Sequence, residues 1–216
     1  FKMKNKLLKI FAGFSIVALL VACGKDKPVT SESNEVLTKT DGVQYKVDTM
    51  NSRVEWKGYK VLKSDQTTHF GNIRFESGDI TVKEGKLQSG KFVADINTLE
   101  NIDLKDNQEM KTKLEGHLKS TDFFEVEKFP TASYEITKVT ETKSGDYNTL
   151  IEGNLTIKGI TKPVQFKANV TVANGNVSIA TEPTDINRED YGLNFEIPFE
   201  NGLLNKSINL QVLIKA

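Results

Sequence analysis

Apolar and polar residues alternate with a period of two through most of the chain from Gly42 onward. The alternation is clearest in five segments, which span residues 53–57, 92–97, 132–136, 164–172 and 208–215. Successive side chains of a β-strand point to opposite faces of a sheet, so each segment carries one apolar and one polar face. Shorter runs of the same kind occur at 73–75, 80–82, 155–157, 177–179 and 193–197. The pattern is typical of antiparallel sheets with one face exposed to water.

Turn sequences separate these segments. Asn174-Gly175 lies between two of them, and Asn-Gly is the strongest short-range signal for a β-hairpin. Further turns are expected at Glu84-Gly85, at Ser144-Gly145 and within residues 159–163. Many short strands joined by regularly spaced turns predict a sandwich or a barrel.

One segment departs from the period of two. Its apolar residues recur at every fourth position, at Met110, Leu114 and Leu118. This spacing predicts a short helix near residues 106–119, with Asp106 as its N-cap. Glycine destabilises a helix interior by about 1 kcal/mol, so we expect the helix to end or bend at Gly116. The aromatic residues of segment 122–130 are expected to form a lip or plug packed on the sheet.

The N-terminal segment has the order of a secretory signal. Lysines at positions 2, 4, 6 and 9 are followed by an uncharged run over residues 10–22 and then by polar residues. The ending Leu20-Val21-Ala22-Cys23 resembles a bacterial lipobox, in which the cysteine is lipidated and becomes the new N-terminus. The alternative is an uncleaved membrane helix, which needs about 20 apolar residues, more than this run provides. We therefore expect a lipoprotein signal peptide over residues 1–22.

The signal implies a lipid-anchored protein of the bacterial cell envelope. Residues 23–41 are mostly polar without periodicity, and they predict a flexible tether between lipidated Cys23 and a single domain over residues 42–216. Gly24, rather than Asp, follows the cysteine, which favours the outer membrane, on its periplasmic side or its surface. The membrane is thus the first expected partner.

Composition excludes several classes of function. Without the signal peptide the chain has 25 basic and 29 acidic residues, a formal net charge of −4, and no basic patch with interleaved aromatic residues. No nucleic-acid partner is therefore expected. Once its only cysteine is lipidated, the chain has no thiol for a disulfide, a nucleophile or a metal ligand. Its stability must come from its core, and its length suits one all-β domain.

The sequence carries no recognisable catalytic motif. It has neither a Gly-x-Ser-x-Gly nucleophile elbow nor a glycine-rich phosphate loop after a strand. His69 and His117 could form a metal or acid–base site with Asp95, Asp103 or Glu115, but their spacing matches no ligand motif. The alternative is that each histidine makes a hydrogen bond at the end of a strand or helix. We expect no catalytic residue, no metal and no cofactor.

Arg188 lies in the polar segment 187–191 and has two interpretations. Its guanidinium could meet an anion at the mouth of a barrel. Alternatively, it pairs with a nearby carboxylate and fixes the loop.

Several stretches, in order along the chain, resemble the YceI-like family of bacterial envelope proteins, which are lipocalin-like binders of polyisoprenoids. They are YKVD at 45–48, SRVEW at 52–56, HFG at 69–71, LKSTDFFEV at 118–126 with FPTA at 129–132, GNLTIKGITKPV at 153–164 and INREDYGL at 186–193. The stretch at 118–132 is the most specific, and the resemblance covers essentially residues 43–216.

The resemblance implies a fold and a ligand. The fold is an extended antiparallel β-barrel of about eight strands, as in lipocalins. The ligand is a long isoprenoid lipid of the polyprenyl or isoprenoid quinone type, held in an apolar tunnel without catalytic residues. The protein would act as carrier, store or sensor. Relatives of this kind are often soluble, and for this chain a homodimer and a monomer both stay open.

The candidate ligand-binding residues are the inward-facing apolar side chains of the expected strands. They are Val54, Trp56, Ile73, Phe75, Phe92, Ala94, Ile96, Ala132, Tyr134, Ile136, Leu155, Ile157, Phe166, Ala168, Leu210 and Val212. His117 and Arg188 are the candidates for polar contacts at the mouth.

Two other functions stay open beside lipid binding. An eight-stranded barrel either holds one slender ligand or is filled by its own side chains. A filled barrel would make the chain a structural or adhesion module that acts through its outer face. The third hypothesis is a metal-dependent enzyme that uses His69 and His117.

Overall fold

The computed structural model describes residues 30–36, 41–62, 65–143, 145–197 and 202–216. The expected signal peptide and Cys23 lie outside the described residues, as does part of the expected tether. In chain order the elements are β1 (Val43–Lys46), β2 (Arg53–Leu62), β3 (Asp65–Lys83), β4 (Lys86–Asn101), α1 (Gln108–Lys119), β5 (Thr131–Glu141), β6 (Thr149–Ile157), β7 (Ile160–Ala173), β8 (Asn176–Thr181), β9 (Thr184–Asn187), the 3-10 helix η1 (Arg188–Tyr191) and β10 (Gly202–Lys215).

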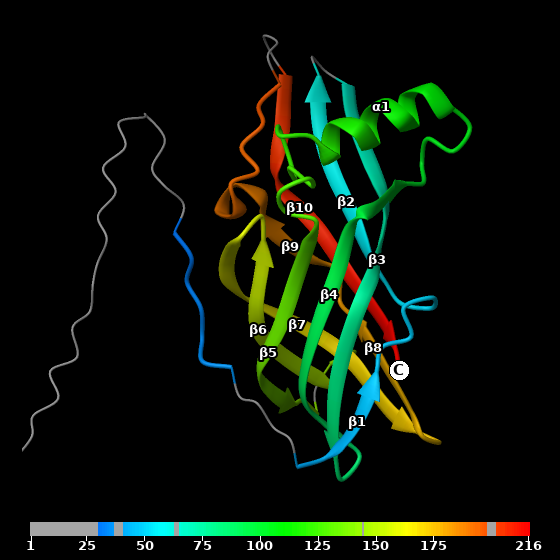
Figure 1. The fold of residues 1–216 in the computed structure, drawn as a ribbon, viewed down its shortest axis with the longest axis vertical. Coiled ribbons are helices and arrows are strands. Elements are labelled where there is room, and N and C mark those ends of the chain that lie inside the picture. Colours follow the sequence, from blue (N-terminus) through cyan, green and yellow to red (C-terminus); the bar gives the residue numbers. More distant parts are fainter. Residues whose placement is uncertain (1–29, 37–40, 63–64, 144, 198–201) are drawn as a thin grey trace, which may run out of the picture.

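Eight antiparallel strands close into a barrel, which confirms the expected lipocalin-like fold (Figure 1). Neighbours around the ring follow chain order from β2 to β8, and β10 closes the ring by pairing with both β8 and β2. Closure pairs the strand edges that an open sheet would leave free. The short strands β1 and β9 add to β3 and β10 and lie outside the ring.

Two of three tight hairpin turns lie where the sequence predicts them, whereas the third lies at Lys158-Gly159, because residues 160–163 of the predicted turn belong to β7. Asn174-Gly175 joins β7 to β8, and both of its residues have positive φ, at 52° and 76°. Glu84-Gly85 and Lys158-Gly159 adopt the same conformation between β3 and β4 and between β6 and β7. Two consecutive residues with positive φ are typical of the type I′ turn, whose twist matches that of the flanking strands.

The helix α1 ends at Lys119, within the predicted range, but it differs from its prediction at the N-cap and at Gly116. Asn107, and not Asp106, is the N-cap, because its side chain accepts a hydrogen bond from the Met110 amide at 3.1 Å. The helix also continues through Gly116 to Lys119. We attribute this to packing, since Leu118 on the final turn contacts the hydrophobic core and offsets the low helix propensity of one glycine.

Three of the shorter alternating runs differ in the structure from the separate strands that the sequence predicts. Residues 193–197, expected as a strand, form an irregular segment after η1, where Gly192 ends the helical turn with a φ of 71°. The runs 73–75 and 80–82 belong to one strand, β3, whose ladder with β4 contains three register shifts. Such shifts bend a strand, which allows β3 to curve around the barrel.

Part of the segment expected to be a flexible tether lies against the outside of the barrel. The side chain of Asn154 accepts a hydrogen bond from the Asn34 amide at 2.9 Å and donates one to the Asn34 carbonyl at 2.8 Å. The Glu32 amide also donates to the Thr161 carbonyl at 2.7 Å. Residues 31–34 are therefore held along β6 and β7.

Candidate functional site: an apolar cavity inside the barrel

An apolar cavity of about 390 Å³ lies inside the barrel beneath α1. This volume falls within the range of about 300–1,000 Å³ that is usual for small-molecule sites. Its walls come from the inward faces of β2 to β8 and β10, so the alternation of the strand sequences is what makes the surface apolar.

Nearly all of the predicted lining residues contact this cavity. They are Val54, Trp56, Ile73, Phe75, Phe92, Ala94, Ile96, Ala132, Tyr134, Ile136, Leu155, Ile157, Phe166, Leu210 and Val212. The exception is Ala168, which is fully buried in the packed core and does not reach the cavity. Its period-two position on β7 predicted the correct face of the strand, but not its depth along the barrel.

The cavity is closed at one end by a packed core. Val47, Ile80, Val82, Leu87 and Val177 are buried there, and none of them lines the cavity. These residues come from β3, β4 and β8 and from the chain just after β1, at the lower end of the barrel in Figure 1. The expected tunnel is therefore a blind pocket whose inner end is filled by aliphatic side chains.

The connecting segments supply a second set of lining residues, at the α1 end. They are Leu114, His117 and Leu118 of α1, Phe123 and Phe124 after it, and Leu193, Phe195 and Ile197 after η1. The predicted helical face and aromatic lip indicate the first two groups, whereas for the third the sequence predicts a strand. The rings of His117, Phe123 and Phe195 contact one another with centroids 4.6 to 5.4 Å apart, and the imidazole meets both phenyl rings edge to face. This aromatic group covers the cavity.

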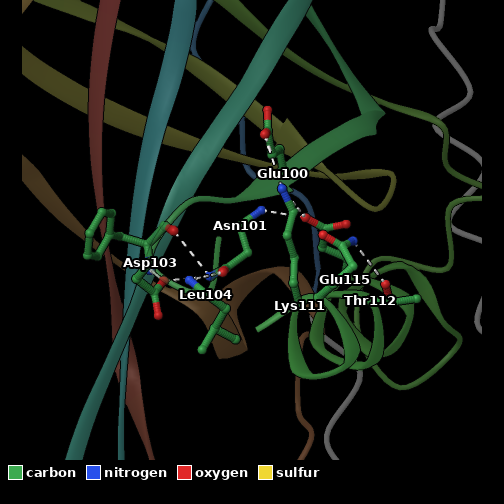
Figure 2. Close-up of polar contacts among 9 residues, drawn as sticks. Glu100, Asn101, Asp103, Leu104, Lys111, Thr112 and Glu115 are labelled. Carbon is green, nitrogen blue, oxygen red and sulfur yellow. Dashed lines mark hydrogen bonds and ion pairs between the residues drawn. The ribbon is translucent and has the colours of Figure 1, made fainter. Parts of the chain in front are cut away.

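A network of hydrogen bonds and ion pairs fastens α1 to the end of β4 (Figure 2). Asn101, which is completely buried, donates from its backbone amide to Glu115 at 2.7 Å, and its side chain accepts from the Leu104 amide at 2.9 Å. Lys111 pairs with Glu100 at 3.2 Å and with Glu115 at 3.6 Å, and Glu100 raises the pKa of the lysine. The helix is thus fixed to the end of β4 by partly buried polar contacts.

His69 belongs to the same network. Its Nδ1 lies 2.8 Å from Oδ2 of Asp103, whose Oδ1 accepts from the Phe70 amide at 2.8 Å and from the Asn101 side chain at 2.5 Å. Burial alone would raise the pKa of Asp103, but the hydrogen bonds from Phe70, His69 and Asn101 outweigh it and lower that pKa. The geometry matches the second interpretation of this histidine, a hydrogen bond at the end of a structural element.

His117 has a different acidic partner. Its Nε2 lies 3.2 Å from Oδ2 of Asp122. Among the described residues, no group of three or more His, Cys, Asp or Glu side chains is arranged to hold a metal ion. His69 and His117 both line the cavity, but each is paired with its own carboxylate.

Arg188 lines the cavity but is not a free cation at its mouth. Its side chain is only 2 % exposed, and it donates hydrogen bonds to the carbonyls of Leu193, Leu204 and Asn205. Burial lowers its pKa, against the effect of the nearby Glu189 carboxylate at 4.0 Å. Neither sequence interpretation anticipated carbonyl partners. Arg188 fastens the irregular segment after η1 to the start of β10.

Tyr134 shows how glycine makes room for the wall of the cavity. Its hydroxyl donates to the Val164 carbonyl at 3.0 Å, and burial raises its pKa well above the usual value. A Cβ atom at Gly153 would lie 2.4 Å from the tyrosine ring, so only glycine allows the ring to cross the neighbouring strand. The ring packs edge-on against Phe166, with centroids 5.3 Å apart.

Fold and cavity together define a lipocalin-like barrel of the class that binds hydrophobic ligands. The family model for the YceI-like domain matches residues 45–216, and the chain therefore belongs to the YceI-like family.

Curated relatives are similar to the chain in sequence, and a solved structure is similar to it in fold. A UPF0312 protein of Pseudomonas putida is 32% identical over 131 residues, which cover 58% of this chain and 60% of that protein. A UPF0312 protein of Shewanella baltica is 28% identical over 167 residues, 77% of this chain and 73% of the relative. The match to the Pseudomonas putida protein thus spans only about 60% of that protein's length. The crystal structure of Burkholderia cenocepacia BcnA shares the fold, with a TM-score of 0.59, 16% identity and coverage of 79% of this chain and 99% of that one.

Among the described residues, no helix is long and apolar enough to cross a membrane.

Proposed function

We propose that this protein binds a long isoprenoid lipid, of the polyprenyl or isoprenoid quinone type, in its barrel cavity at the bacterial envelope. The observation that carries the proposal is the cavity of about 390 Å³ with an almost entirely apolar wall. A structural module with a filled barrel, the alternative that the sequence left open, has no need of such a space. The chain acts by binding, and no residue is assigned a catalytic role.

The energetics favour reversible binding, as in a carrier, over very tight binding. Burying a methylene group from water gains about 0.8 kcal/mol, so one five-carbon isoprene unit gains about 4 kcal/mol. The competitor, however, is the bilayer, whose hydrocarbon interior is as apolar as the cavity. Transfer between membrane and barrel is then nearly neutral, and the lipid can exchange in both directions.

A lipid anchor on Cys23 would raise the concentration of barrel beside its lipid source. We include this anchor in the proposal, with the outer membrane as its location, on the strength of the lipobox-like sequence. The test is incorporation of a labelled fatty acid by the full chain in a bacterial host. Label should be incorporated by the natural chain and lost in Cys23→Ala; equal labelling of both would refute the anchor.

Lipid extraction from purified protein tests the binding itself. Ala132 faces the cavity on β5 beside its ladder partner Ala94, so Ala132→Phe should place a ring in the cavity in front of these two small residues. Thr171→Phe adds the same ring on an exposed position of β7 and serves as the matched control. We expect mass spectrometry to find an isoprenoid lipid with the natural chain and with Thr171→Phe, and much less with Ala132→Phe. Absence of lipid from all three proteins, even after incubation with membrane vesicles, would overturn the proposal.

A further inference from the structure

A buried asparagine on the outer face of β6 shows how the chain before the barrel is held. Leu155 lines the cavity, so the preceding residue, Asn154, points outward, yet it is only 6 % exposed. Its side chain exchanges two hydrogen bonds with the backbone of Asn34. Residues 31–34, which we call the docked segment, therefore cover Asn154.

The docked segment also contacts β7. The contacts are a hydrogen bond from the Glu32 amide to the Thr161 carbonyl at 2.7 Å, one from the Thr161 amide to the Ser31 side chain at 3.1 Å, and an ion pair of Glu32 with Lys162 at 3.2 Å. Thr161 lies closer to the β6–β7 turn than Asn154 does. From Asn34 to Ser31, the chain therefore runs toward that turn.

The chain before β1 leads from one end of the barrel to the other. Asp41 pairs with Lys83 at 2.6 Å beside the β3–β4 turn, at the end that the packed core closes, which we call the packed end. Ser31, in contrast, lies close to the β6–β7 turn. Just after that turn, Ile160 packs in one cluster with Leu193, which lines the cavity at the α1 end. Followed toward the N-terminus, the described chain thus rises from the packed half to the cavity half (Figure 1).

The length of chain before Ser31 limits where an anchor can lie. Cys23 is eight residues away, and an extended chain spans at most about 3.5 Å per residue, so a lipid on Cys23 would lie within about 28 Å of Ser31. Thr161 and Ala173, at the packed end, are twelve positions apart on β7. This is about 40 Å along the strand and about 30 Å along the axis of a barrel whose strands tilt by about 40°. Only a fully stretched chain would therefore approach the packed end.

Exposed apolar side chains do not choose between the two ends of the barrel. At the α1 end, Met110 on the helix and Leu203 at the start of β10 are 45 % and 60 % exposed. Toward the packed end, Val43 on β1 and Met50 after it are 60 % and 82 % exposed. Either end could touch a bilayer if the barrel were free to turn, so the point of attachment decides which end does.

We propose that the docked segment holds the cavity half of the barrel, rather than its packed half, toward the membrane, so that lipid passes over a short path between bilayer and cavity. This inference rests on the lipid anchor of the proposed function. Without the docked contacts, the barrel would be attached through Asp41 at its packed end, by eighteen residues that span up to about 60 Å. With them, the point of attachment moves to Ser31, beside the cavity half.

Energy transfer to a membrane dye tests the orientation. The full chain, acylated on Cys23 in a bacterial host, is added to phosphatidylethanolamine–phosphatidylglycerol vesicles that carry an acceptor dye on a lipid headgroup. Because Cys23 is blocked, one introduced cysteine takes the donor dye, in Thr121→Cys after α1 or in Ala173→Cys at the packed end, both at exposed positions. We expect transfer about twofold or more higher from position 121, since the two ends differ in height by about 30 Å. Equal transfer from both positions, or the reverse order, would overturn the inference.

Two changes should reduce the difference in transfer, each in its own way. Asn154→Ala removes the side chain that holds Asn34, whereas about twelve Gly and Ser residues inserted after Lys27 lengthen the chain without touching the barrel. Gln165→Ala is the matched control and should keep the difference, because this exposed residue of β7 bonds to Glu152 and not to the docked segment. A reduction by either change supports the inference, and a difference left intact by both contradicts it.

Lipid extraction from the same proteins separates this inference from the proposed function. If lipid is recovered while the orientation is absent or reversed, the role of the docked segment is overturned and lipid binding stands. If the natural chain takes up no fatty acid on Cys23, the anchor and the orientation are both overturned. The extraction then decides by itself whether the cavity binds lipid.

Discussion

The two ends of the barrel are built from the same alternating strands but are packed in opposite ways. At the lower end, buried aliphatic side chains such as Ile80 and Val82 meet and fill the interior. Beneath α1, Ala94 and Ala132 face each other across the β4–β5 ladder, and aromatic rings line a space that they do not fill. Similar apolar inward faces therefore form a filled, stabilising half and a hollow, binding half, according to which side chains meet across the ring.

The comparison predicts that stability depends most on the packed end. Ile80→Ala should lower the free energy of unfolding by about 2–5 kcal/mol, because the side chain is fully buried and no space is available for its neighbours to relax. Denaturant unfolding measures this loss. A cost below 1 kcal/mol would show that this end is not the rigid core described here.

The next largest effect is expected in the network that fastens α1. Asn101→Ala removes buried hydrogen bonds to the Phe70 carbonyl, Asp103 and the Leu104 amide, and should destabilise the protein by about 1–3 kcal/mol. Lipid exchange should also become faster, because the helix over the cavity is less firmly held. The exposed Asn97 on the same strand is the control, and Asn97→Ala should change stability by no more than about 0.5 kcal/mol. Unchanged exchange kinetics in Asn101→Ala would argue against a covering role for α1.

A smaller effect is expected for an inward leucine of the hollow end. Leu210 lines the cavity and is only partly buried, so one side of its chain has few atoms to contact. Leu210→Ala should therefore cost about 1 kcal/mol, less than the range for packed positions. The same unfolding measurement decides the point, and a cost equal to that of Ile80→Ala would erase the distinction between the two ends.

The smallest effect should be a pH dependence confined to the end beneath α1. The pKa of Asp103 is lower in the folded protein than in the unfolded chain, so its contribution is complete above its ordinary pKa of about 4 and is lost as the pH falls through the folded value. Asp103→Asn should be less stable than the natural chain at pH 7, and the difference should shrink on acidification. A difference that stays constant from pH 7 to pH 2 would contradict this assignment.

Sequence patterns predicted which side chains point into the barrel better than they predicted how far along the barrel each side chain lies. Period-two alternation identified which side chains point inward, and all but Ala168 of the predicted set line the cavity. Alternation alone has no information on where along the barrel the interior is filled, since this depends on which side chains meet across the ring. Glu84-Gly85 and Asn174-Gly175 were predictable because both residues of a type I′ turn need positive φ.

The elements at the mouth were harder to predict. Residues 193–197 alternate like a strand, but after Gly192 they run along the cavity, where Arg188 holds the Leu193 carbonyl. The N-cap at Asn107 was missed by one residue, because Asp106 and Asn107 are both good caps and only the three-dimensional path of the loop chooses between them.

The position of β10 in the ring has a consequence for how the newly made chain folds. Ribosomes make the chain from its N-terminus, and the last strand to be made, Gly202–Lys215, is the one that joins β8 to β2. Until β10 has been made, the other strands can form only an open sheet, which exposes an apolar face and two unpaired strand edges. Assembly is then governed by contacts between residues far apart in sequence, such as Trp56 with Leu210, which makes it slow. A barrel that lacks β10 exposes apolar surface and unpaired strand edges, which favour aggregation until this strand has paired.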